Sequence, residues 1–168
     1  MERTLVILKP DALQRGIAGE ILSRFERVGL KIVAAKMLSP DYDHYYHHYE
    51  TIGKMISRRG EEAFEATLEM MQRGPVLAMV LEGVEAVEQV RKMVGTTEPK
   101  AAQPGTIRGD FAHVSFKHAN STGLGIANLI HASGDTKEAA EEITHWFGAD
   151  EIFPYETTDE IYTQPKGK

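Results

Sequence analysis

Three short apolar runs along the chain predict buried strands. They cover residues 4–8, 31–38 and 76–81. A proline lies close to one end of each run, where it ends regular pairing and marks a boundary. A weaker pattern, in which Val114 and Phe116 alternate with His113 and Ser115, predicts a half-exposed fourth strand.

Apolar residues at helical spacing predict most of the remaining elements. The expected helices cover residues 17–28, 41–49, 61–72, 84–94 and 136–147. Asp135, with Glu138 three residues later, resembles a capping box at the start of the last helix. Residues 51–60, 95–110 and 117–125 are expected as linking segments or loops, and residues 149–168 as a tail.

The order of these elements gives two βαβ halves separated by helices. It predicts an α+β fold, a ferredoxin-like sandwich in which helices cover one face of a four-stranded, mainly antiparallel sheet. Helical and loop insertions would extend this framework. A length of 168 residues, with no internal repeat and no linker, indicates a single domain over residues 1–168.

Composition narrows the functional class. An apolar share of 42% supplies a real core, and the absence of cysteine excludes disulfides and thiolate metal sites and fits a reducing compartment. Residues 1–8 lack a signal region and no run reaches membrane-spanning length, so we expect a cytoplasmic protein without a membrane partner. A net charge of -6 argues against nucleic-acid binding.

The stretch from Asn128 to Ser133 contains the first candidate for chemistry, His131. We expect this histidine at a turn just before a helix, where neutral imidazole is a nucleophile and helix N–H groups favour an anion. Asn128 and Ser133 offer an amide and a hydroxyl that could orient an attacked phosphate. The pattern indicates phosphoryl transfer through a phosphohistidine, although spacing alone also allows an ordinary turn histidine.

An acidic protein that binds a phosphate ligand must gather its cations locally, and three are candidates. Lys9 is aimed by the proline that follows it, Arg108 lies in a glycine-rich loop and could bind two phosphate oxygens, and Arg91 lies on a helix striped with valines. Each could instead be an ordinary surface cation. His44 and His48 are spaced as metal ligands on a helix, but a solvated face is the favoured interpretation.

No P-loop and no protein-kinase motif set is found, yet the sequence resembles the nucleoside diphosphate kinase family. The resemblance runs from Thr4 to Phe147. It rests on the motifs Lys9-Pro10-Asp11, Gln14-Arg15-Gly16, Gly19-Glu20-Ile21, Arg24-Phe25-Glu26, Gly74-Pro75-Val76, Glu82-Gly83, Pro104 to Phe111 and Asn128 to Ser133.

The resemblance implies a role for each candidate. His131 would be phosphorylated, and Glu142 would hold its other ring nitrogen. The expected nucleotide-binding residues are Lys9, Tyr49, Arg91, Thr97, Arg108, Asn128 and Ser133. Mg²⁺ would be carried by the nucleotide phosphates, with no metal ligands in the protein. The partners would be nucleoside di- and triphosphates and further copies of this chain, in a tetramer or hexamer.

The sequence departs from the family pattern in three places. Segments 51–62 and 112–127 are longer than usual, and Gly134 stands where many members have Asp, with Asp135 next. Ala63 occupies the position of the aromatic residue that normally stacks on the base, so Phe64 is the expected ring. The implied activity is transfer of a terminal phosphate between nucleotides by a ping-pong route. A non-catalytic nucleotide-sensing module is the alternative.

Overall fold

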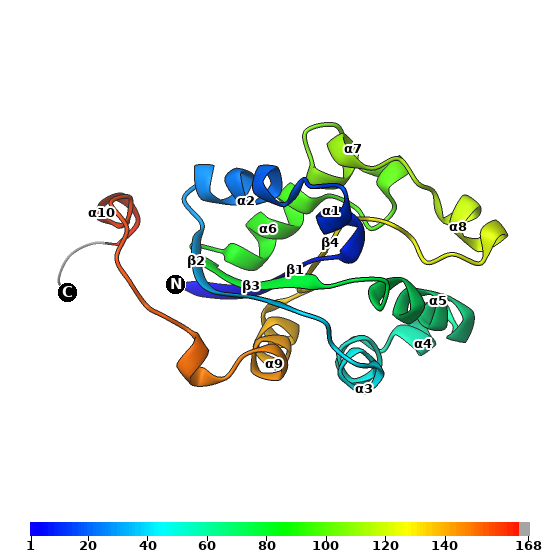
Figure 1. The fold of residues 1–168 in the computed structure, drawn as a ribbon. Coiled ribbons are helices and arrows are strands. Elements are labelled where there is room, and N and C mark those ends of the chain that lie inside the picture. Colours follow the sequence, from blue (N-terminus) through cyan, green and yellow to red (C-terminus); the bar gives the residue numbers. More distant parts are fainter. Residues whose placement is uncertain (165–168) are drawn as a thin grey trace.

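The computed structural model describes residues 1–164, with a four-stranded sheet between two layers of helices (Figure 1). The strands are β1 (Glu2–Leu8), β2 (Lys31–Leu38), β3 (Val76–Gly83) and β4 (Ile130–Ala132). Their order is β2-β3-β1-β4, and every neighbouring pair is antiparallel. The ferredoxin-like α+β fold is confirmed, as are the three strands predicted from apolar runs.

The central strand β1 is buried on both of its faces. Leu5 and Ile7 join one apolar core, whereas Val6 and Leu8 join another, and all four side chains have no exposed surface. The prediction that helices cover only one face was therefore wrong. Continuous apolar runs without alternation are typical of strands that are covered on both sides.

Two layers of helices supply this cover (Figure 1). On one face lie α2 (Ala18–Arg27) and α6 (Ala86–Val94). The short helix α1 (Pro10–Gln14) comes before α2 in the chain, and η2 (Pro99–Ala101) and α7 (Ile107–Phe111) come after α6. On the other face lie α3 (Tyr42–Tyr46), α5 (Glu61–Met71) and α9 (Thr136–Trp146). The Asp135 side chain caps α9 by accepting from the Glu138 N–H at 2.8 Å.

The predicted fourth strand at Val114–Phe116 was wrong. Ser115 instead caps a helix, α8 (Phe116–Thr122), by accepting from the backbone N–H of His118, and Gly123 ends that helix in the left-handed conformation. Four alternating residues are too few to specify a strand against a strong cap and a glycine stop. The fourth strand is β4, so His131 lies on a sheet edge rather than at a turn.

The segment expected as a polar linker after residue 50 also has regular structure. It contains a π-helix, η1 (His47–Ile52), and then α4 (Met55–Arg59). The Glu50 carboxylate accepts a hydrogen bond from the Ile56 N–H at 2.7 Å and so ties the two elements together. This segment reaches the same end of the sheet as His131.

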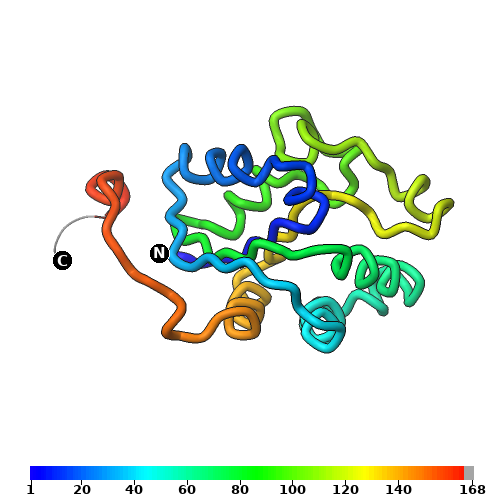
Figure 2. The backbone as a smooth tube through the Cα atoms, in the orientation of Figure 1, coloured from blue at the N-terminus to red at the C-terminus, as the bar shows by residue number. Residues whose placement is uncertain are grey.

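The tail packs along β2 and can be followed in Figure 2 from α9 onward. It includes η3 (Ala149–Glu151) and α10 (Glu160–Thr163). Phe153 donates its N–H to the Val33 carbonyl at 2.8 Å, and Lys31 Nζ binds Glu160 at 2.6 Å. The last four residues of the expected tail lie outside the described residues. Within residues 1–164, no helix is both long and apolar enough to cross a membrane.

Candidate functional site

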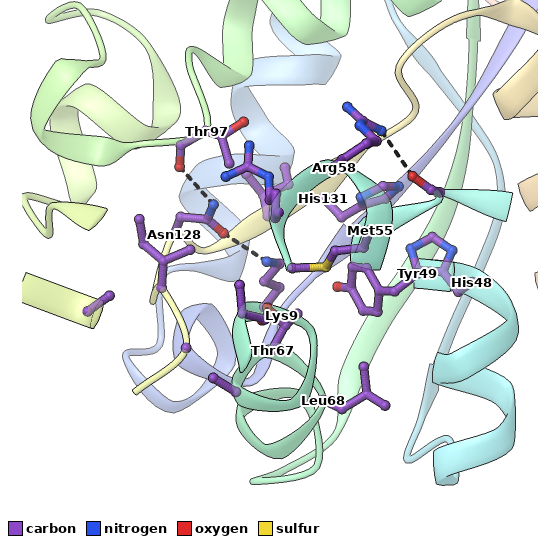
Figure 3. Close-up of a pocket in the computed structure, with 18 of the residues that line it drawn as sticks. Lys9, His48, Tyr49, Met55, Arg58, Thr67, Leu68, Thr97, Asn128 and His131 are labelled. Carbon is purple, nitrogen blue, oxygen red and sulfur yellow. Dashed lines mark hydrogen bonds between the residues drawn. The ribbon is translucent and has the colours of Figure 1, made fainter. Parts of the chain in front are cut away.

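A cavity of about 1590 Å³ opens beside β4. Its walls come from the end of β1, the π-helix η1, helices α4 and α5, the end of α6, and the segment that carries α8. Figure 3 shows Lys9, Tyr49, Asn128 and His131 pointing into this space from different elements. Residues far apart in the sequence therefore meet at one site.

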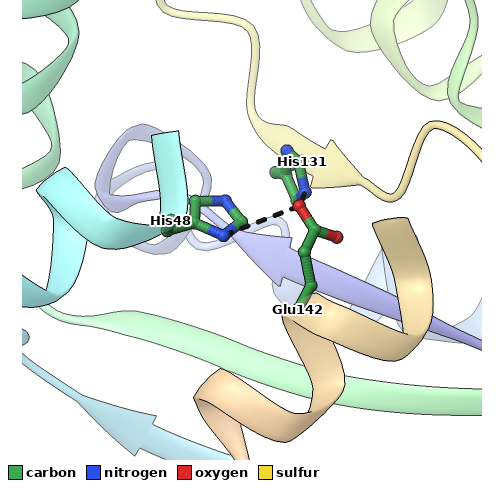
Figure 4. A group of neighbouring side chains, drawn as sticks. All are labelled: His48, His131 and Glu142. Carbon is green, nitrogen blue, oxygen red and sulfur yellow. Dashed lines mark hydrogen bonds and ion pairs between the residues drawn. The ribbon is translucent and has the colours of Figure 1, made fainter. Parts of the chain in front are cut away.

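His131 lies on β4, opposite Ile7 of β1, and lines the cavity. Its Nε2 is 2.7 Å from the Oε1 of Glu142, a buried residue of α9 (Figure 4). The second carboxylate oxygen accepts a hydrogen bond of 2.6 Å from Ser133 Oγ. Because Nε2–H donates to the carboxylate, the ring is held in one tautomer and Nδ1 keeps its lone pair.

The His131 ring is uncharged at neutral pH. Burial lowers its pKa to about 3, and the positive charge of Lys9 adds to this effect. Burial raises the pKa of Glu142 above its ordinary value. A neutral imidazole with a free nitrogen is a competent nucleophile, whereas a protonated ring is not.

Lys9 is held at the same site by a chain of hydrogen bonds. Its Nζ donates to Asn128 Oδ1 at 2.8 Å, and Asn128 Nδ2 donates to the Thr97 carbonyl at 2.8 Å. Pro10 opens α1 directly after Lys9, which fixes the backbone there. Burial, with the charge of Arg108, lowers the pKa of Lys9 to about 8. A buried cation of this kind favours an incoming anion.

Arg108 is buried and fixed by the backbone. Its Nε, Nη1 and Nη2 donate to the carbonyls of Asn128, Gly95 and Ile130 at 3.1, 3.0 and 2.5 Å. Burial, with the charge of Arg91, lowers its pKa to about 10. Two terminal N–H groups of the guanidinium remain to donate to a phosphate ligand. The other three N–H groups hold together the backbone segments that form the cavity wall.

Arg91 differs from Arg108 because it is exposed. Its one hydrogen bond within residues 1–164 is a long contact of 3.5 Å from Nη1 to the Ser133 carbonyl. It lines the cavity from the last turn of α6, outside the apolar stripe of that helix. It therefore supplies an exposed charge to the cavity, whereas Arg108 supplies a buried one held by three hydrogen bonds.

The π-helix η1 carries two more residues of the site, His48 and Tyr49. Both are buried, and their ring centroids lie 4.5 and 6.3 Å from that of His131. His48 Nδ1 accepts from the Trp146 indole at 3.1 Å, so the interpretation of His44 and His48 as a solvated helix face was wrong for His48. π-helical turns are often found at functional sites.

The comparisons with known proteins agree with this geometry. The profile of the nucleoside diphosphate kinase family matches residues 2–152. The chain is 47% identical to the nucleoside diphosphate kinase of Borreliella burgdorferi, covering 95% of each chain, and 48% identical to that of Pyrococcus furiosus, covering 99% of this chain and 96% of that one. The chain belongs to the nucleoside diphosphate kinase family. It is therefore a phosphotransferase enzyme.

Two solved structures of nucleoside diphosphate kinases extend the likeness to the fold. One is a transition-state mimic of the Borrelia burgdorferi enzyme with bound vanadate and ADP, which has a TM-score of 0.92 at 46% identity and covers 96% of this chain and 95% of that chain. The other is the Halobacterium salinarum enzyme in complex with CDP, with a TM-score of 0.81 at 35% identity and coverage of 96% and 97%. The fold predicted for a nucleoside diphosphate kinase is thus confirmed.

Two residues expected at the nucleotide lie elsewhere. Phe64 is 1% exposed and belongs to the core between α5 and the sheet, where its ring meets the Tyr46 ring edge-on at 5.6 Å. It does not line the cavity, so the expectation that it stacks on the base was wrong. Ser133 does not line the cavity: its hydroxyl donates to the Glu142 carboxylate at 2.6 Å and accepts from the Leu5 N–H at 3.1 Å.

The cavity residues that the sequence prediction did not name include Arg58, Arg59 and Phe116. All three lie in segments 51–62 and 112–127, which we expect from the sequence to exceed the family pattern in length. The Arg59 guanidinium lies 4.9 Å from the centre of the Phe116 ring, and Arg58 donates to the Gly53 carbonyl at 3.1 Å. Only the adjacent pair of arginines in segment 51–62 signalled a charged function there.

Proposed function

We propose that this nucleoside diphosphate kinase transfers phosphate through a covalent intermediate on Nδ1 of His131. One observation carries the proposal: Glu142 holds Nε2 at 2.7 Å, which leaves Nδ1 as the available nitrogen of a neutral ring that lines the cavity. Lys9 and Arg108 line the same cavity, so an attacked phosphate would be surrounded by positive charge.

In the first half of the reaction, the Nδ1 lone pair of His131 attacks the terminal phosphorus of a nucleoside triphosphate. The P–N bond forms as the bond from that phosphorus to the bridging oxygen breaks, and the diphosphate leaves with the electron pair. The proton stays on Nε2, where Glu142 stabilises the positive charge that develops on the ring. Lys9, Arg91 and Arg108 neutralise charge on the phosphoryl oxygens.

In the second half, a different nucleoside diphosphate binds at the same place. Its terminal oxygen attacks the phosphorus, the P–N bond breaks, and the electron pair returns to Nδ1. The neutral ring is regenerated without any net proton transfer at Nε2. Both halves use one set of residues, because donor and acceptor share the same phosphate and sugar groups.

The remaining expected contacts follow from their positions. Asn128 and Thr97 hold Lys9 through their hydrogen bonds and lie within reach of the phosphates and sugar. Tyr49 lines the cavity with a buried hydroxyl that has no partner within residues 1–164, so it is available to a nucleotide. Ser133 acts through Glu142. ADP and CDP, named for the two related structures, represent the class of substrate we propose here.

Mg²⁺ fits this site as a companion of the nucleotide. Within residues 1–164, one cluster brings three possible ligand groups together, namely His48, His131 and Glu142. These groups already contact one another and Trp146, and Mg²⁺ prefers oxygen ligands. We therefore propose that the ion binds the nucleotide phosphates, where it neutralises charge between them.

We further propose that residues 1–168 act as one kinase domain in a cytoplasmic homo-oligomer of four or six copies. The absence of cysteine is compatible with a reducing compartment. Sedimentation velocity of the purified protein would measure the number of copies directly, and a monomer at micromolar concentration would contradict the oligomer.

Initial-rate kinetics test the covalent route. Varying the triphosphate at several fixed concentrations of the diphosphate should give parallel double-reciprocal lines, which is the signature of a ping-pong mechanism. Intersecting lines would indicate direct transfer within a ternary complex and would contradict the role of His131.

A further inference from the structure

The aromatic ring for the nucleobase is missing from its expected place. Ala63 lines the cavity at the position that the family pattern gives to an aromatic residue, and Phe64 lies in the core. A methyl group offers little surface for stacking. Another ring is therefore needed if the base is to be held.

Three Phe or Tyr side chains line the cavity: Tyr42, Tyr49 and Phe116. Tyr49 is 9% exposed and packs beside His131, where the phosphates are expected. Tyr42 is 41% exposed, and its hydroxyl donates to Glu65 at 3.2 Å while its ring packs near that of Tyr46. Phe116 remains, and it is half-buried at the outer part of the cavity.

Phe116 is held in place by the surrounding chain. Its N–H donates to the Glu98 carboxylate at 2.8 Å, and the Val114 carbonyl two residues earlier accepts from the Lys100 N–H at 3.2 Å. At the other end of the segment, Gly125 lies so close to α5 that a Cβ there would come within 2.4 Å of the Ala66 carbonyl oxygen. The segment therefore spans the cavity as a fixed wall.

Arg59 packs on this ring and lines the same cavity as the residues expected to bind phosphate. Its guanidinium lies over the Phe116 ring at 4.9 Å. Burial is the main cause of the lowered pKa values of Lys9 and Arg108, but the charge of Arg59 also contributes to both. Arg59, Phe116, Lys9 and Arg108 all line the same cavity, which a nucleotide would fill from its base to its phosphates.

We propose that Phe116 forms the base subsite of this kinase and that a nucleobase takes the place of the Arg59 guanidinium over its ring. The displaced guanidinium then turns toward the phosphates, beside Lys9 and Arg108. Ala63 and Ala66 of α5 form the opposite apolar wall. This inference rests on the proposed nucleotide site at His131. Phe116 and Arg59, which lie in the two longer segments, then determine nucleotide affinity.

A comparison of ligands with and without a base tests the subsite. Calorimetry would measure the binding of ADP, CDP and inorganic tripolyphosphate to the wild type and to Phe116→Ala. Because stacking on one aromatic ring contributes a factor of about 5 to 150, the Kd values of ADP and CDP should rise by that range. The Kd of tripolyphosphate should not rise, because this ligand has no base to lose. Phe116→Trp should bind both nucleotides as tightly as the wild type.

The controls separate this inference from the underlying function. Tyr42→Ala removes the other exposed ring of the cavity and should leave all three Kd values unchanged. Phe116→Leu keeps an apolar side chain without an aromatic face and should resemble Phe116→Ala. Unchanged nucleotide binding by Phe116→Ala, equal loss of tripolyphosphate, or restoration by Leu would each overturn the base subsite. Failure of the wild type to form a phosphoprotein with ATP would instead overturn the site at His131.

Discussion

The two ends of the cavity are built in different ways. At the inner end, Lys9, Arg108, His131 and Glu142 are held by hydrogen bonds of 2.5 to 3.1 Å to buried or partly buried partners. At the outer end, Arg59 is exposed, and its guanidinium lies over the face of the Phe116 ring at 4.9 Å from the ring centre. The residues that need a fixed geometry thus lie at the end of the sheet and on the helices packed against it, whereas the residues that would hold a variable base lie in segments 51–62 and 112–127.

The difference predicts that changes at the inner end affect the rate of transfer, while changes at the outer end affect binding. Replacement of His131 by Ala should produce the largest effect. Loss of the nucleophile should reduce transfer by more than about 10⁴-fold, since removal of a covalent catalyst leaves only binding contributions. Coupled spectrophotometric assays at saturating substrate would measure this loss.

Binding provides the control for His131→Ala. The variant should keep its circular dichroism spectrum and bind ADP with a Kd within about threefold of wild type, because a nucleophile contributes little to ground-state affinity. Substantial residual transfer by the folded variant would show that the inner end works without a phosphohistidine.

The orientation of the His131 ring should matter less than its presence. Glu142→Gln removes a charged hydrogen-bond acceptor worth on the order of 1.5–3 kcal/mol, which corresponds to a fall in kcat of about 10- to 100-fold. Glu141→Gln, at the exposed neighbouring position on α9, is the matched control and should be neutral. Wild-type kcat in Glu142→Gln would contradict the orienting role.

The charge of Lys9 should set the alkaline limit of substrate capture. Its pKa is lowered to about 8 by burial and by Arg108, so the ammonium form that attracts phosphate is present below that pH and is lost above it. The profile of kcat/KM should therefore fall above about pH 8, by about tenfold per unit, because this ratio reports the free enzyme.

Lys9→Gln gives the control for the pH profile. Its kcat/KM should be lower than that of the wild type at pH 7, and the limb near pH 8 should be absent. A wild-type profile that stays flat to pH 9.5 would show that Lys9 is not the titrating cation of the inner end.

The smallest effect concerns the identity of the base. A stacking ring contributes about 1–3 kcal/mol per base without reading its edges. The kcat/KM values for ATP, GTP, CTP and UTP, and for their deoxyribose forms, should therefore lie within about tenfold of one another. A thousandfold preference for one base would require a hydrogen-bonding reader at the outer end.

The same contrast explains what the sequence could predict. The three strands could be anticipated because apolar runs mark them, and Lys9, Arg108 and His131 could be anticipated because the family motifs contain them. Glu142 needed the resemblance, since eleven residues separate it from His131 and spacing alone does not select it among its acidic neighbours.

The outer end could not be predicted from the sequence. Whether Phe64 or Phe116 faces the cavity depends on how α5 and the longer segments pack, and this is decided by tertiary contacts. The prediction of a fourth strand at Val114–Phe116 was wrong because the Ser115 side chain caps helix α8, and this cap outweighs the short alternating pattern. The burial of His48 was not predicted, because this residue lies in a π-helix, whose number of residues per turn differs from that of the α-helix assumed from the sequence.

Direct detection of the phosphorylated nitrogen tests whether the phosphate passes through Nδ1 of His131. The protein would be incubated with Mg²⁺ and ATP labelled at the terminal phosphate, and the product analysed by peptide mapping and ³¹P–¹⁵N correlation in denatured, alkaline solution. We predict one acid-labile, base-stable phosphate on Nδ1 of His131, which a second nucleoside diphosphate removes before denaturation. A phosphate found on Nε2 or on another residue would contradict this route. So would the absence of any phosphoprotein while transfer proceeds at its full rate.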